Sequence, residues 1–212
     1  MIVIYKIFNL ASLKQTKSAH QQKMDYDNAI FCLNIITNTV EMAPVVTKSM
    51  IEKIVVEEGC ASAEASVRTS GLSWLTRWVV SKTLGFQDSV MKGSFGSQGS
   101  STDDTELESG EEENLVTSGN GFVLLAYLIV DDGIPSGSSS RSIRDIILKE
   151  LPNDEDGKSG GIQFIIKALK AFCNFYHYSV GDLSVAVIAP VIKLIAGLEK
   201  TDLLSGPEQE DC

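Results

Sequence analysis

Apolar side chains that recur at three- and four-residue spacing constrain this chain more than any other feature. The clearest run covers 162–178, where Lys167 and Lys170 fall outside the apolar set. Its apolar members are Ile162, Ile165, Ile166, Leu169, Phe172, Cys173 and Tyr176. This spacing is typical of an amphipathic helix that turns one face to a core. The pattern predicts a helix over 162–178.

Helix signals continue along the chain. Asp25 or Asp27 can cap a helix that starts near residue 28, and Pro44 suits the first turn of a helix reaching residue 56. Further helices are expected at 73–86, 121–130, 142–151 and 185–198, the last kinked or broken by Pro190. No series of strands competes with them. Six to eight helices arriving in pairs predict an all-α fold, an α-solenoid of HEAT or armadillo-like repeats.

Residues 93–120 (GSFGSQGSSTDDTELESGEEENLVTSGN) differ in character from the rest of the chain. Gly, Ser and acids bury too little apolar surface to offset the entropy of ordering, so we expect a disordered acidic linker. It would divide one array into segments 1–92 and 121–200, with a flexible tail at 201–212. A phosphorylated or partner-binding segment is the alternative, since Ser100, Ser101 and Thr102 precede acids.

The net charge of −10 reflects this linker, because seven of the 28 acids lie between residues 97 and 118, where there is no Lys or Arg. Elsewhere acids and the 18 bases nearly balance. No basic stripe is present, so we expect no direct nucleic-acid binding.

The four cysteines are scattered without a CxxC pair, and His20 and His177 lack ligands at metal-binding spacing. We therefore expect reduced thiols in an intracellular protein, with no metal, cofactor or small-molecule ligand. His177 is expected to have a packing or helix-end role. Nothing approaches the ~20 apolar residues of a membrane helix. The apolar start MIVIYKIFNL lacks signal-peptide features, and we expect the chain to be the C-terminal piece of a longer protein.

Catalytic motifs do not fit the sequence. GSFGSQG and GKSGG lack the setting of a phosphate-binding loop, and no GxSxG or HExxH pattern occurs. We expect a binding protein rather than an enzyme, with a hydrolase of unrecognised site as the remote alternative.

Two amides stand one turn apart in AIFCLNIITNTVEMAP. Asn34 and Asn38 are expected to bond to a neighbouring helical unit, and a ligand-facing polar ladder is the alternative. Trp74 and Trp78 are expected in the core. The candidates for a structural or partner-facing role are Asn34, Asn38, Glu41, Arg77, Lys82, Lys167 and Lys170.

The order of several segments between residues 25 and 200 resembles a known family. They are CLNIITNTVE, SWLTRWVVSKTLGFQDSVM, the acidic insertion, GFVLLAYLIV, LPNDEDGKSGGIQFIIKALKAFCNFY and VIAPVIKLIAGLE. Together they resemble the C-terminal region of the wings apart-like cohesin-release proteins. The matching positions are Leu33, Asn38, Val40 and Glu41; Leu124, Leu125 and Leu128; Leu151 and Pro152; Ile165, Leu169, Lys170, Phe172 and Phe175; and Leu198 and Glu199.

This resemblance implies a nuclear, chromatin-associated HEAT-repeat protein. It implies binding to cohesin ring subunits and to a cohesin-associated HEAT-repeat regulator, and release of cohesin from chromatin during sister-chromatid cohesion and the cell cycle. Such a protein acts by contacts that favour an open state of its partner. The alternative is an armadillo- or HEAT-type scaffold unrelated to cohesin.

Overall fold

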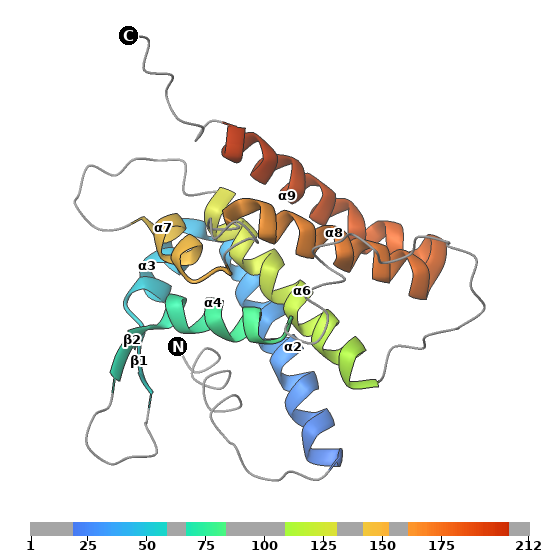
Figure 1. Ribbon diagram of the computed structural model, residues 1–212, viewed down its shortest axis with the longest axis horizontal. Helices are drawn as coiled ribbons and strands as arrows, with labels where there is room; N and C mark the ends of the chain where they lie inside the picture. Colours follow the sequence, from blue (N-terminus) through green and yellow to red (C-terminus); the bar gives the residue numbers. More distant parts are fainter. Residues whose placement is uncertain (1–18, 59–66, 84–108, 131–141, 153–160, 204–212) are drawn as a thin grey trace.

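The computed structural model describes residues 19–58, 67–83, 109–130, 142–152 and 161–203 (Figure 1). Most of these residues are helical, which confirms the expected all-α class at this level. The elements in chain order are α2 (Ala19–Met42), α3 (Pro44–Glu52), β1 (Val55–Glu58), β2 (Val67–Ser70), α4 (Gly71–Ser81), α6 (Ser109–Val130), α7 (Ile143–Lys149), α8 (Gly161–Val180), the 3-10 helix η1 (Gly181–Ser184) and α9 (Val185–Leu203).

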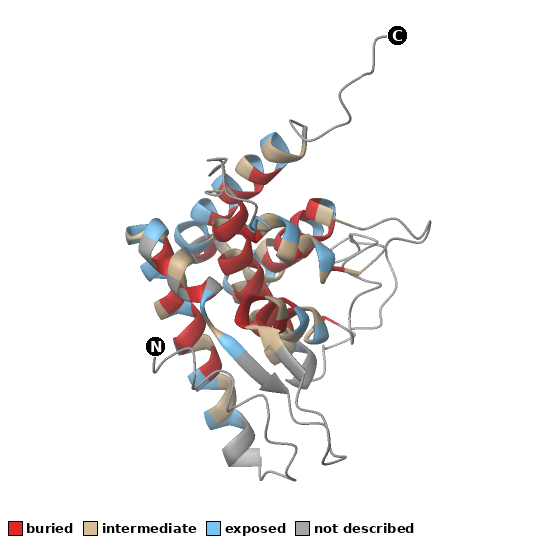
Figure 2. Cartoon of the chain, turned by 90° about the vertical axis from the view of Figure 1, so that its left-hand side faces the viewer, coloured by how far each residue is buried: buried red, intermediate tan, exposed pale blue. Residues whose placement is uncertain are grey.

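Helix α6 is the centre of the fold. It packs against α2, α4, α7, α8 and α9, and runs diagonally between them in Figure 1. Its side chains are buried on nearly all sides, including Phe122, Leu124, Leu125 and Leu128. Figure 2 shows the buried residues concentrated where these helices meet. The all-round apolar composition of 121–130 is explained by this central position.

Two glycines let neighbouring helices approach α6 closely. A Cβ at Gly119 would overlap the ring of Phe172 on α8, and one at Gly121 would lie 2.5 Å from Val79 on α4. Glycine weakens a helix interior, but here it makes room for side chains from both flanking helices.

The linker expected over 93–120 is wrong in its second part, which forms the first half of α6. Residues 109–120 are helical, with Leu115 buried, whereas 93–108 lies outside the described residues. Thr117 and Ser118 donate hydrogen bonds to the carbonyls of Glu113 and Leu115 within the helix. Ser and Thr side chains can be buried when they donate hydrogen bonds to carbonyls of their own helix. The polar composition of this segment therefore led to the wrong prediction of a linker.

Two further helix boundaries differ from those expected. The structure already describes α2 as helical at Ala19, well before the expected start near residue 28. The helix expected to reach residue 56 ends at Glu52, and Val55 begins a two-stranded antiparallel sheet in which it pairs with Ser70. The run Ile54–Val56 is β-branched, which disfavours a helix and suits a strand.

Helices α8 and α9 form an antiparallel hairpin. Gly181 adopts φ +61°, the left-handed conformation that commonly ends a helix, and η1 leads directly into α9. Polar pairs join the two helices away from this turn: Gln163 donates to Asp202 (2.7 Å), and Lys170 lies 2.9 Å from Glu199. Pro190 lies inside α9 without ending it.

One described segment, Glu112–Val130, is long and apolar enough to cross a membrane by length and composition, contrary to the sequence-based expectation. It belongs to α6, and 61% of it is buried inside the fold. A core helix passes the same test, and the packing of five helices around α6 accounts for its composition.

Candidate functional site

The candidate residues on α2 lie on its outer surface. Asn34, Asn38 and Glu41 are exposed, and neither amide forms a hydrogen bond with another described residue. None of the described helices therefore provides the partner expected for Asn34 and Asn38, and that expectation stays a prediction. The helix turns Leu33, Ile36 and other apolar residues to α6 instead, which leaves the amides on the solvent side.

Arg77 and Lys82 lie on and just after α4. Arg77 is 3.8 Å from a carboxylate oxygen of Glu150, whose other oxygen accepts a hydrogen bond from Ser73 (2.7 Å). Glu150 follows α7, so these contacts join α4 to the end of α7. They give Arg77 a structural role in the described fold.

Lys82 lies over an aromatic pair. The rings of Trp74 and Trp78 are stacked with centroids 6.1 Å apart, and Lys82 Nζ is 6.0 Å from the Trp78 centroid. Burial lowers the pKa of Lys82, and the negative charge of Glu113 opposes that shift. Trp74 is buried as expected, while Trp78 is half-buried against the core and supports the Lys82 side chain.

The two α8 candidates differ in their contacts. Lys167 is exposed, and Lys170 is paired with Glu199 of α9. The structure thus distributes the seven candidate residues over α2, α4 and α8, and does not bring them together at one site.

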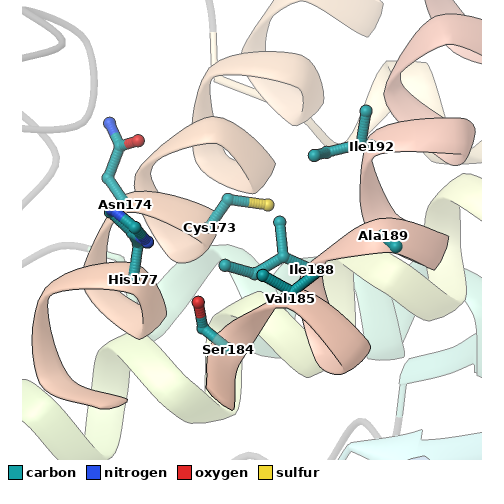
Figure 3. Close-up of a pocket in the computed structure, with 8 residues that line it drawn as sticks. All are labelled: Cys173, Asn174, His177, Ser184, Val185, Ile188, Ala189 and Ile192. Carbon is teal, nitrogen blue, oxygen red and sulfur yellow. The ribbon is translucent and has the colours of Figure 1, made fainter. Parts of the chain in front are cut away.

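A groove lies near the α8–α9 turn (Figure 3). Its volume is about 340 Å³. Its polar lining residues are Cys173, Asn174, His177 and Ser184, and its apolar lining residues are Val185, Ile188, Ala189 and Ile192. The sequence alone did not predict this groove, because the turn at Gly181 is what places Cys173 and His177 of α8 opposite α9.

Ser184 is the unusual residue of this groove. Its hydroxyl oxygen is fully buried and has no hydrogen-bond partner. The other buried polar side chains of the described residues, which are Thr47, Thr76, Thr83, Thr117 and Ser118, all bond to backbone carbonyls. Figure 3 shows the Ser184 hydroxyl pointing into the space between His177 and Val185. A buried hydroxyl without a partner costs free energy.

The thiol in the groove is not activated. Burial raises the pKa of Cys173, so the protonated thiol predominates at neutral pH. Figure 3 shows its sulfur directed toward the apolar side chains of α9, away from the His177 ring. Among the described residues, the Cys173 thiol therefore lacks the neighbouring base that activates a nucleophilic cysteine.

Among the described residues, no group of three or more His, Cys, Asp or Glu side chains is placed to hold a metal ion. Comparison of the chain with models of known protein families, with curated proteins and with solved structures found no match.

Proposed function

We propose that this chain is a helical protein-binding module that promotes release of cohesin from chromatin. The observation that carries a binding role is the exposed apolar surface at the α8–α9 turn. Ten large hydrophobic side chains of the described residues are exposed, and five of them lie between residues 178 and 192: Tyr178, Val180, Val185, Val187 and Ile192. Clustered exposed apolar groups are typical of sites where another protein docks.

The cohesin assignment rests on the resemblance of the segments between residues 25 and 200 to the wings apart-like family. In this proposal the helices belong to a HEAT-type array, and the antiparallel α8–α9 pair with its short η1 connection is one helical-repeat unit. The chain would bind ring subunits and a HEAT-repeat regulator in the nucleus, without an active site of its own.

An affinity pull-down from nuclear extract, with mass spectrometry of the retained proteins, tests this proposal. We expect recovery of cohesin ring subunits at moderate salt. A parallel experiment with Ile192→Glu reports whether the exposed apolar surface is used, because Ile192 is 56% exposed and its replacement leaves the core intact. Recovery of unrelated partners, with cohesin absent, would contradict the cohesin role and support a scaffold of another pathway.

A further inference from the structure

An apolar stripe runs along the outer face of α9, opposite the face that packs on the core. Its members are Val185, Ala189, Ile192 and Ala196, at spacings of four, three and four residues. All four are exposed, and the first three also line the groove against α8. This is the spacing by which one helix packs along another, and the alternation of large and small side chains leaves room for a partner's side chains.

Charge is distributed unevenly beside the stripe. Lys193 and Lys200 are exposed and one heptad apart, about 10.5 Å along the axis at the usual helical rise. Neither forms an ion pair with another described residue. The acids Glu199 and Asp202 are already bonded to Lys170 and Gln163. The edge of the stripe away from α8 is therefore basic, although the whole chain carries −10.

We propose that the groove and stripe bind an amphipathic helix of a partner protein, with an aliphatic face on α9 and acidic residues opposite Lys193 and Lys200. Charge complementarity favours this acidic helix over a second copy of the chain, which would bring Lys193 and Lys200 to a surface that already carries them. The inference rests on the proposed protein-binding role but does not depend on cohesin as the partner.

The test uses the full chain and two synthetic, fluorescein-labelled helices of about three heptads with leucine at the stripe positions. One peptide carries Glu at the flanking positions and the other carries Lys. We expect fluorescence anisotropy to show at least about tenfold tighter binding of the Glu peptide at low salt, with the difference reduced at high salt. Equal affinities, or no binding of either peptide, would overturn the proposal.

Charge-reversed and matched variants locate the binding. Lys193→Glu should shift the preference toward the Lys peptide, and Ile192→Glu should weaken both peptides by about tenfold or more. Lys149→Glu on α7 and Met42→Glu on α2 replace exposed residues of the same kinds elsewhere and should leave binding within about twofold. If the control variants lost as much peptide affinity as Ile192→Glu, the peptides would not bind at the groove and stripe.

The outcomes separate this inference from the cohesin role. If the Glu peptide binds but the pull-down recovers no cohesin, the groove would be supported as a helix-binding site and the cohesin role would be rejected. If Ile192→Glu recovers as much cohesin as the unchanged protein, the cohesin role would be supported and the groove would be rejected as the cohesin-binding site. Sedimentation of the protein alone provides a further check, since a dimer abolished by Ile192→Glu would make a second copy the occupant and overturn the proposal.

Discussion

Two buried serine hydroxyls, those of Ser184 and Ser118, differ in their hydrogen bonding. The Ser184 hydroxyl is buried without a partner, whereas the buried Ser118 hydroxyl donates to the Leu115 carbonyl. Folding must desolvate both groups, but only Ser118 regains a hydrogen bond within the described fold. The groove thus keeps an unsatisfied polar atom, whose desolvation is not offset by a hydrogen bond within the described residues.

Replacing that hydroxyl should stabilise the protein. We expect Ser184→Ala to raise the free energy of unfolding by about 1 kcal/mol, because it removes a desolvated group that has no partner. Ser118→Ala should leave stability unchanged or lower it by up to about 1 kcal/mol, since it removes a satisfied hydrogen bond. Urea titrations of both variants provide the measurement. A loss of stability in Ser184→Ala would mean that the hydroxyl has a partner in solution.

The thiol of Cys173 should be a slow nucleophile. Burial raises its pKa above the ordinary value of 9.0, so alkylation of Cys173 should still accelerate above pH 9.0 in the folded protein. In denaturant its profile should have a midpoint near that ordinary value. Mass spectrometry of the peptide carrying Cys173 after timed iodoacetamide treatment distinguishes it from the other cysteines. A midpoint below 9.0 in the folded state would indicate an activated thiol and contradict the binding interpretation.

Two half-buried phenols are expected to lower the stability of the protein at high pH. Burial raises the pKa of Tyr26 on α2 and of Tyr176 on α8, and their mutual repulsion when charged adds to the shift for Tyr26. A raised pKa in the folded state means that stability is fully present below about pH 10 and is lost as pH rises through the folded pKa. Lys82 has the opposite effect on the pH dependence of stability. Because its pKa is lowered in the folded state, its contribution makes stability rise with pH until the pH reaches 10.5, the ordinary pKa of lysine. Denaturant titrations above pH 10 should show a net loss that Tyr176→Phe reduces, and an unchanged slope would contradict the assignment.

At the scale of elements, the helices with strong apolar periodicity were predictable. The segments expected at 73–86, 142–151, 162–178 and 185–198 correspond to α4, α7, α8 and α9. The first half of α6 was missed because its periodic positions are occupied by Ser118 and Gly119, which are buried without being apolar and large. The groove was missed because it depends on how Gly181 and η1 place α9 against α8, which is tertiary information.

Close helix approach makes one glycine of α6 hard to replace. Gly119→Ala would place a methyl group on the ring of Phe172, and we expect a loss of about 1–3 kcal/mol in the free energy of unfolding. Gly197→Ala in α9 is a matched comparison, since its Cβ would lie 3.3 Å from Val130, a contact that a small shift can relieve. The gain in helix propensity should then keep that change within about 1 kcal/mol. Equal effects of the two substitutions in thermal unfolding would argue against the tight α6–α8 contact.

At the scale of the whole molecule, the central position of α6 makes the fold depend on one helix. Helices α2, α4, α8 and α9 all pack on it, and the core formed there includes Leu33, Val79, Phe164 and Leu198 from these four helices. A change that removes part of α6 therefore exposes apolar surface on several helices at once. Residues 109–120 therefore matter more to stability than their polar composition suggests.

Two nested deletions test this dependence. Removal of 97–108 takes away mainly Ser, Thr, Gly, Gln and acidic residues, and from this composition we expect the Tm to change by no more than a few degrees. Removal of 97–118 also takes away buried Leu115, Thr117 and Ser118, and with them half of the helix on which the others pack. That longer deletion should abolish the cooperative transition in circular dichroism, because the loss of several buried side chains exceeds the stability of a typical domain. If both deletions left the same Tm, residues 109–118 would not be part of the core, and the central role of α6 would be limited to its second half.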